Sequence, residues 1–444
     1  MYNLNVMNIF ALTFGCKVNQ YESYAMLELL SSSGFNVVKN MSKADIIIIN
    51  SCTVTSKSDQ KLRQTVNRIR RENKNVIIVL VGCMPQAFPE TSKSILGLDI
   101  ILGNCERKYI KTAICKFLVE RKKFFKVDEH SKFSQFENIS VSNFQTKTRA
   151  FLKIEDGCNQ FCSYCIIPFA RGRVRSRSIK DIVLQTKNLA LKGYKEIIIV
   201  GINLSAYGKD FNLNLSDAIE AVCSVEGVER VRLGSLEPKI ITDSFLKKIS
   251  NQLKVCPQFH LSLQSGCNKT LKSMNRNYTT LEYENIVKNL RSAYDNPAIT
   301  TDLLVGFPGE SDEDFNETKE FVEKIKFSKA HIFKYSKRPK TKSYELKDNV
   351  DPYIKNKRSK EIFNIVRRTS KEFVSSQIEK KDSVLFESIF KDGFSEGYSS
   401  KFVKVRVFSK SLLCGKILNV VLKDFKEEKN SYVFYAEVFD DKCG

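Results

Sequence analysis

The sequence predicts an α/β protein in three parts: an open parallel sheet, an incomplete barrel of βα units and a small closed β-barrel. Apolar strand-like runs alternate with helical stretches over the first 120 or so residues, and six further strand–helix units follow them. From about Glu379 the pattern changes to short alternating stretches with basic residues interleaved. A chain of 444 residues suggests about three domains, and we expect them at 6–120, 146–375 and 377–442.

The first part is expected to form a flavodoxin-like sheet. Its continuous apolar runs are typical of parallel strands that are buried on both faces. A helix is expected at about 20–33, and the strand candidates lie at 8–14, 45–50, 76–81 and 99–102.

Three cysteines occupy equivalent places in this sheet, because Cys16, Cys52 and Cys83 each come directly after a strand candidate. The carboxyl ends of parallel strands share one edge, where ligands bind, so we expect the three thiols to converge. Nearby helix amino termini would favour their thiolate forms. The alternative is three unrelated buried cysteines, which are common in α/β cores. Cys105 also follows a strand candidate but lies deeper in its loop, so we leave it out of the set.

A second set of cysteines lies on a single loop, where Cys158, Cys162 and Cys165 form a CxxxCxxC run. Three thiolates can hold three irons of a 4Fe–4S cube and leave the fourth iron open, whereas a cluster that only carries electrons usually has four cysteine ligands. A zinc site would need a fourth ligand, and the sequence has no second cysteine pair or nearby histidine for it. The run therefore predicts a cluster that can bind a substrate or cofactor.

The CxxxCxxC run resembles the signature of the radical S-adenosylmethionine (SAM) superfamily. The two cysteine sets together resemble those of the radical SAM methylthiotransferases, over essentially the whole chain. The blocks 15–23, 50–55 and 82–86 match the three cluster-ligand blocks of that family, and 171–177 matches the block after the radical SAM loop.

The resemblance implies two 4Fe–4S clusters and SAM as cofactors. Cys158, Cys162 and Cys165 would hold the cluster whose open iron chelates SAM, which is then cleaved to a 5′-deoxyadenosyl radical. The second set, Cys16, Cys52 and Cys83, would hold an auxiliary cluster that presents the sulfur to be transferred. Two SAM molecules would be used per turnover, one for the methyl group and one for the radical.

The middle part is expected to be a partial (βα)6 barrel that binds SAM. Barrel enzymes place their chemistry at the carboxyl ends of the strands, where polar and glycine residues cluster here. We expect SAM contacts from Gly201, Ser235, Glu237, Gln264 and Gly306. The strand candidates lie at 151–155, 196–201, 230–235, 259–263, 300–305 and 329–335.

The last part is expected to be a small OB-like barrel, with strands at 402–408, 415–422 and 431–439. By position it resembles the TRAM domain that ends the methylthiotransferases, although a β-module that merely caps the larger barrel is the alternative. The net charge of +22 indicates a polyanionic partner. We expect RNA rather than DNA, bound through Arg171, Arg173, Arg175, Arg177, Lys404 and Arg406. For the run 171–177 the alternatives are an ordinary solvated charged loop, or a role in holding SAM or the cysteine loop.

No run approaches the ~20 apolar residues that a membrane span needs, so we expect no membrane partner. Thirteen cysteines in a chain this long do not suggest a secreted disulfide framework, and a cytoplasmic location is expected.

The resemblance implies methylthiolation of tRNA at adenosine 37, next to the anticodon. Lys17 and Val18 after the first cysteine, and residues 333–338, resemble the subgroup that acts on N6-threonylcarbamoyladenosine. Isopentenyladenosine in tRNA, an aspartate of a ribosomal protein and a non-enzymatic iron–sulfur RNA-binding protein remain as alternatives. A threonylcarbamoyl carboxylate would need a cation, for which Lys17, Lys337 and Arg338 are candidates. An electron donor and a sulfur source would be further partners.

Overall fold

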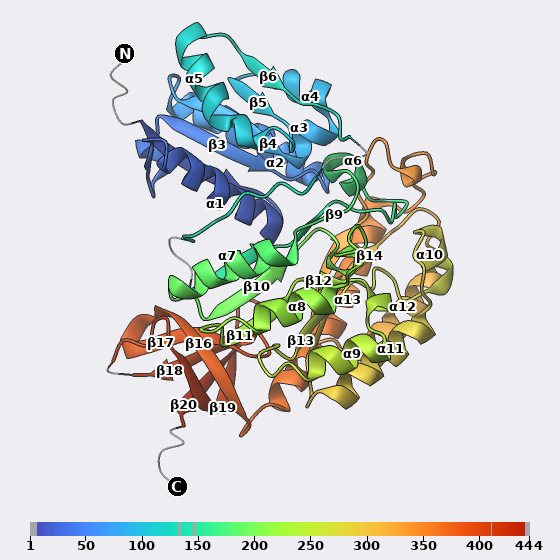
Figure 1. Ribbon diagram of the computed structural model, residues 1–444. Coiled ribbons are helices and arrows are strands. Elements are labelled where there is room, and N and C mark those ends of the chain that lie inside the picture. Colours follow the sequence, from blue (N-terminus) through green and yellow to red (C-terminus); the bar gives the residue numbers. More distant parts are fainter. Residues whose placement is uncertain (1–6, 132–134, 145–147, 410, 440–444) are drawn as a thin grey trace.

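The computed structural model describes residues 7–131, 135–144, 148–409 and 411–439, and the three expected parts follow one another along the chain (Figure 1). The N-terminal sheet lies over one end of the larger barrel, and the C-terminal barrel lies at the other end (Figure 1). The expected boundaries at residues 6, 146 and 442 lie outside the described residues. No helix within the described ranges is both long and apolar enough to cross a membrane.

The N-terminal sheet is parallel throughout, with the strand order β2-β1-β3-β4-β5-β6. The order of its first five strands is that of a flavodoxin-like sheet, as expected. The two edge strands, β2 (Asn36–Val37) and β6 (Phe124–Lys126), were not predicted. The four predicted strands are β1 (Asn8–Thr13), β3 (Ile46–Ser51), β4 (Ile77–Gly82) and β5 (Ile100–Leu102).

Helices cover both faces of this sheet, which explains the continuous apolar runs. In β3, Ile46 and Ile48 pack under α1 and α5, whereas Ile47 and Ile49 face α2. Successive strand residues point to opposite faces, so a strand covered on both sides has to be apolar at every position. The helices of this part are α1 (Lys17–Ser31), α2 (Ser56–Glu72), α3 (Cys83–Ala87), α4 (Pro89–Lys93) and α5 (Ile110–Glu120).

The larger barrel contains the six predicted units in sequential order, and no pairing between β7 and β15 closes it within the described residues. Gly234 lies where the third strand is interrupted, and a Cβ there would lie 3.0 Å from the carbonyl oxygen of Ile199, so this close approach of the backbone favours glycine. The strands are β7 (Arg149–Lys153), β10 (Glu196–Val200), β11 (Arg230–Leu233), β12 (Ser235–Leu236), β13 (Gln258–Leu261), β14 (Ala298–Val305) and β15 (Lys329–Lys334).

Most helices of the barrel begin at polar residues whose side chains accept a hydrogen bond from the first turn, whereas α10 begins at Cys267 without such a bond. Capping boxes start α8, α11 and α12 at Asn214, Thr279 and Ser311. Besides a short helix in the cysteine loop, the helices are α7 (Ile179–Leu191), α8 (Leu215–Cys223), α9 (Asp243–Ser250), α10 (Asn268–Ser273), α11 (Thr280–Ala293), α12 (Asp312–Ile325) and α13 (Pro352–Ser375).

The C-terminal part is a closed five-stranded barrel with the order β16-β17-β18-β20-β19, as in an OB-like fold. The prediction found its last three strands and missed the first two. Gly397 makes β17 hard to recognise from the sequence, since glycine is depleted in strands. The strands are β16 (Lys381–Ile389), β17 (Phe394–Ser399), β18 (Lys404–Phe408), β19 (Ile417–Glu428) and β20 (Ser431–Val438).

Two arginines of the larger barrel join it to the C-terminal barrel. Arg232 pairs with Glu196 at 3.0 Å and donates to the carbonyl oxygens of Ser399 and Ser400 at 3.2 and 2.8 Å. Arg149 binds Glu387 of β16 through two hydrogen bonds of 2.7 and 3.0 Å. Arg232 is buried and Arg149 is half-buried, so these charge-assisted contacts fix how the two barrels sit against each other.

We expect Arg232→Met to lower the free energy of unfolding by about 3 kcal/mol, because it removes one partner of a buried ion pair and takes a donor away from the carbonyl oxygens of Ser399 and Ser400. Urea unfolding of the purified chain measures the change. Lys248→Met is the control, since its ammonium is exposed and lies 3.3 Å from Asp217, and should cost less than about 1 kcal/mol. Equal effects of the two substitutions would contradict this account of barrel docking.

Candidate active site between the sheet and the barrel

The structure brings the three dispersed cysteines together at the carboxyl edge of the N-terminal sheet. Cys16 is the N-cap of α1, Cys52 follows β3, and Cys83 begins α3 directly after β4. A Cβ on Gly15 would lie 2.8 Å from the Cβ of Cys52, so the first two ligand loops touch. Burial, together with the neighbouring thiols of Cys83 and Cys16, raises the pKa of Cys52 to about 12.

Asn19, in the first turn of α1, connects these loops. Its Nδ2 donates to the carbonyl oxygens of Phe14 and Ser51 at 2.9 and 3.0 Å. Its Oδ1 accepts from the thiol of Cys16 at 3.6 Å. A buried side chain with each polar atom engaged fixes the geometry of the first two ligand loops.

The second cysteine set lies on a loop that a short antiparallel pair closes. This pair joins β8 (Glu155–Asp156) to β9 (Arg175–Ser176), and α6 (Ile167–Arg171) lies between them. Gly157 adopts a φ of +89°, and a Cβ there would lie 2.0 Å from the carbonyl oxygen of Arg173. Only glycine fits this turn, which starts the loop immediately before Cys158.

Two thiols of this loop accept hydrogen bonds from side chains at the mouth of the barrel. Asn203 donates to the sulfur of Cys158 at 3.6 Å, and Arg276 donates to the sulfur of Cys162 at 3.2 Å. Burial raises the pKa of Cys158 to about 11, and it also raises the pKa of Cys165. The three thiols are near enough that Cys162 and Cys158 both raise the pKa of Cys165.

The chemistry of both sets fits iron–sulfur clusters. The six thiols form no disulfides, and at least one sulfur in each set accepts a hydrogen bond from a buried arginine, as Cys83 does from Arg171 at 3.3 Å. Cationic donors suit anionic cluster ligands. Within the described ranges no three His, Cys, Asp or Glu side chains surround a position for a single metal ion. A cube differs from such a site because each cysteine binds a different iron.

The residues expected to contact SAM all lie at the carboxyl edge of the barrel strands, on the side of the cysteine loop. Gly201 follows β10, Glu237 follows β12, and Gly306 follows β14 with its N–H donating to Glu310 at 3.0 Å. The hydroxyl of Ser235 lies 2.9 Å from that of Ser262. Gln264 has a φ of +70° and exchanges backbone hydrogen bonds of 2.8 Å with Asp302 and Leu304.

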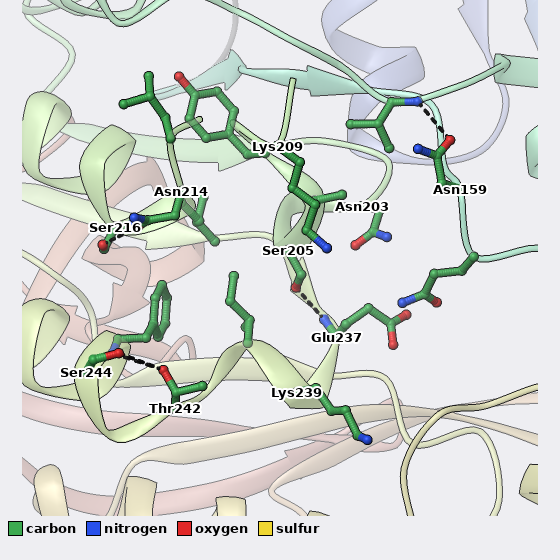
Figure 2. Close-up of a pocket in the computed structure, with 18 of the residues that line it drawn as sticks. Asn159, Asn203, Ser205, Lys209, Asn214, Ser216, Glu237, Lys239, Thr242 and Ser244 are labelled. Atoms are coloured by element: carbon green, nitrogen blue, oxygen red, sulfur yellow. Dashed lines mark hydrogen bonds between the residues drawn. The ribbon is translucent and has the colours of Figure 1, made fainter. Parts of the chain in front are cut away.

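A cavity of about 680 Å³ opens beside the cysteine loop at the same edge (Figure 2). This volume is within the usual range for small-molecule sites. Glu237 is held in its wall, since its N–H donates to Ser205 at 2.8 Å and its carboxylate accepts from Arg276 at 2.6 Å. Polar side chains labelled in Figure 2 that line the cavity include Asn159, Asn203, Ser205, Lys209, Glu237 and Lys239.

The structure corrects the expectation that the whole arginine run faces RNA. Arg171 is 0% exposed and Arg177 is 2% exposed, so neither can reach a phosphate. Arg175 is half-buried and donates to the carbonyl oxygens of Arg173 and Arg171, each at 3.0 Å. Arg173 is exposed and lies over the ring of Phe161, 4.7 Å from its centroid.

A second correction concerns β18. Arg406 is 3% exposed and pairs with Glu396 and Glu428, so it holds the C-terminal barrel together instead of facing solvent. Lys404 is half-exposed and pairs with Glu396 at 2.9 Å. Charged residues that alternate along a strand can point to solvent or to buried partners on neighbouring strands, and the sequence alone does not distinguish the two.

The three candidate cations for a substrate carboxylate differ in their burial and in their partners. Arg338 is buried and pairs with Asp59 at 2.6 Å, so it is already neutralised. It also donates to Thr53, next to Cys52, at 2.7 Å, and therefore supports that ligand loop. Lys337 lies over the ring of Tyr344 at 4.9 Å. Lys17 is exposed beside Cys16.

Sequence reasoning missed two residues that touch the ligand loops, Asn19 and Arg276. Asn19 lies three residues after Cys16, a spacing that places it in the first helical turn and could have drawn attention to it. Arg276 is 114 residues from Cys162, and no local pattern connects the two.

Two family models match the chain. One is described as uncharacterized protein family UPF0004 and matches residues 8–103, and the other is described as the radical SAM superfamily and matches residues 152–322. A solved structure of the radical SAM methyltransferase TsrM from Kitasatospora setae, with cobalamin and a 4Fe–4S cluster bound, has a TM-score of 0.55. It is 14% identical and covers 76% of this chain and 77% of that one, which is a likeness of fold.

Sequence relatives span nearly the whole chain. It is 36% identical over 435 residues to the threonylcarbamoyladenosine tRNA methylthiotransferase MtaB of Bacillus subtilis, covering 97% of this chain and 96% of that protein. It is 38% identical to the MtaB of Aquifex aeolicus, covering 81% and 88%. It is 33% identical to the tRNA-2-methylthio-N(6)-dimethylallyladenosine synthase of Endomicrobium trichonymphae, covering 95% and 98%.

An incomplete parallel barrel that carries a CxxxCxxC loop at its mouth defines the radical SAM class. With these relatives at 33–38% identity, the chain belongs to the radical SAM methylthiotransferase family.

We expect Arg338→Ala to lower the free energy of unfolding by about 3 kcal/mol, because it removes the cation that pairs with the buried carboxylate of Asp59. Lys337→Ala is the matched control from the same segment, and its exposed side chain should contribute less than about 0.5 kcal/mol. Chemical unfolding of the two variants beside the parent measures the difference. An unchanged stability for Arg338→Ala would mean that Arg338 is not committed to this pair.

Proposed function

We propose that this protein is a tRNA methylthiotransferase that converts N6-threonylcarbamoyladenosine at position 37 to its 2-methylthio derivative. The observation that carries the proposal is the meeting of two open three-cysteine sets at one interface, each beside a buried arginine. The relatives named for this activity, which cover 97% and 81% of this chain, support the same assignment.

Two 4Fe–4S clusters and SAM are the proposed cofactors. Cys158, Cys162 and Cys165 would hold the radical SAM cluster, and the auxiliary cluster would bind to Cys16, Cys52 and Cys83. When bound, these groups supply a radical that activates an unreactive aromatic C–H bond and the sulfur that replaces the hydrogen. The protein orients them and excludes water. The proposed SAM contacts are Gly201, Ser235, Glu237, Gln264 and Gly306.

The choice of substrate depends on a cation for the threonylcarbamoyl carboxylate, and we assign this role to Lys17. Lys17 follows Cys16 directly, and the adenine base of a tRNA substrate presented to the auxiliary cluster would lie beside it. An isopentenyl group would need an apolar wall instead of this charge.

Exposed cations and aromatic rings would bind the tRNA. Arg173 lies near the cysteine loop, and Lys209 reaches into the cavity beside it (Figure 2). On the C-terminal barrel the rings of Phe390 and Phe408 are exposed, which suits stacking on bases. These rings replace Arg406 as the proposed RNA contacts of that part.

The three parts would divide the work. Residues 6–120 would carry the auxiliary cluster, residues 146–375 the radical SAM chemistry, and residues 377–442 RNA binding. An electron donor and a sulfur source would be further partners, because each turnover uses an electron and a sulfur atom. We propose the cytoplasm as the location, since tRNA and reduced thiols are both present there.

Mass spectrometry of tRNA nucleosides tests the function. In a host that lacks its own methylthiotransferases, expression of this chain should add a methylthio group to threonylcarbamoyladenosine. Lys17→Ala should reduce the product at least about tenfold, which corresponds to about 1.4 kcal/mol for a lost carboxylate partner. Lys337→Ala is the control and should retain the activity. A methylthio group on isopentenyladenosine alone would replace the proposed substrate with the dimethylallyl one.

Salt dependence of tRNA binding tests the RNA contact of Arg173. Arg173→Ala should weaken binding and make the dependence of log K on log salt shallower by about 0.7–0.9, as expected for one phosphate contact. Lys187→Ala, an exposed lysine on α7, is the control. An unchanged slope for Arg173→Ala would leave it as a solvated loop residue.

A further inference from the structure

We propose that Arg171 is a positioning residue for the auxiliary cluster, a buried guanidinium that supports its thiolates and sets its reduction potential. The inference rests on the proposed function, because it assumes that Cys16, Cys52 and Cys83 hold a cluster. It gives a role to a residue of the arginine run that burial removes from RNA binding.

The contacts of Arg171 reach all three ligand loops. Its Nε donates to the sulfur of Cys83 at 3.3 Å, and its Nη2 donates to Oδ1 of Asn19 at 2.5 Å. Asn19 in turn contacts the thiol of Cys16 and the carbonyl oxygen of Ser51, the residue before Cys52. A planar guanidinium has fixed donor directions, so it can hold this geometry where a lysine could not.

Arg171 also joins the two cysteine sets mechanically. It ends α6, six residues after Cys165, and α6 packs on α3, which begins at Cys83. Cys83, Ile166 and Ala170 belong to one small apolar cluster. The position of the auxiliary ligand helix therefore depends on the helix that follows the radical SAM loop.

The charges around Arg171 leave an excess of positive charge beside the thiols. The ion pairs connect four cations to three carboxylates, namely Arg107, Lys153, Arg171 and Arg175 to Glu22, Glu137 and Asp156. Burial alone would raise the pKa of Glu22, but the charges of Arg107, Arg171 and Lys153 outweigh it. The net effect lowers the pKa to about 2, so this carboxylate is ionised. A cube held by three thiolates is anionic, so the spare cation would balance it.

This arrangement predicts opposite electrostatic effects for Arg171 and Glu22. Reduction adds negative charge to a cluster, so a nearby cation raises the potential and a nearby anion lowers it. A purely mechanical role would not give opposite signs, because loss of either partner would loosen the same contacts. The sign of the shift therefore separates the two roles.

The test uses a chain with Cys158, Cys162 and Cys165 replaced by Ala, which leaves the auxiliary cluster alone. Its midpoint potential is measured by titration followed by electron paramagnetic resonance. Arg171→Gln should shift the potential to more negative values, and Glu22→Gln should shift it to more positive values. Arg173→Gln, an exposed cation two residues along, is the control and should leave the potential unchanged.

No shift for Arg171→Gln, or shifts of the same sign for both variants, would overturn the proposal. If Arg171→Gln fails to hold iron, the Glu22→Gln variant decides alone. A positive shift of its midpoint potential supports the proposal, and a negative shift or no shift contradicts it. Failure of the cluster assignment itself is distinguishable, because the parent chain with three alanines would then bind no cluster at all. Failure of the proposed tRNA activity is seen separately, in the mass spectrometry of tRNA nucleosides.

Discussion

The buried carboxylate of Glu22 joins the N-terminal sheet to the barrel, and the candidate site depends on it. Glu22 lies on α1 and pairs with Arg107 at 3.1 Å, with Lys153 of β7 at 2.8 Å and with Arg171 of α6. A buried charge that loses its partner costs about 3–5 kcal/mol, so the segments that carry these cations are committed to one arrangement. Because α1 begins directly after Cys16 and α6 follows Cys165, the same network fixes how the two cysteine sets face each other.

The architecture explains why two cysteine sets from different parts of the chain can meet. Both parts are parallel α/β structures, and each presents its cysteine set at the carboxyl edge of its strands. In a flavodoxin-like sheet the ligand crevice lies between β1 and β3, and these strands lead to Cys16 and Cys52. The sheet lies over one end of the barrel (Figure 1), and α3 of the sheet packs on α6 of the barrel, so the two edges meet. A reaction that needs both a radical and a sulfur atom at one carbon requires such a meeting.

Periodicity and position predicted most of the architecture, because buried parallel strands are recognisable as continuous apolar runs and their carboxyl ends must share an edge. The convergence of Cys16, Cys52 and Cys83 followed from that rule alone. Edge strands of two or three residues, such as Asn36–Val37, are too short for such a pattern. The burial of Arg171 could not be foreseen either, since its partner Glu22 is 149 residues away and a charge in a sequence does not reveal whether a counter-charge meets it in the fold.

The central claim is that one chain holds two open clusters across this interface, and iron content after anaerobic reconstitution tests it most directly. The account predicts about eight iron atoms per chain, from two four-iron clusters, and about four after replacement of either cysteine set by Ala. About four iron atoms in the unaltered chain would contradict the account. So would a full complement of about eight in the chain that lacks Cys16, Cys52 and Cys83.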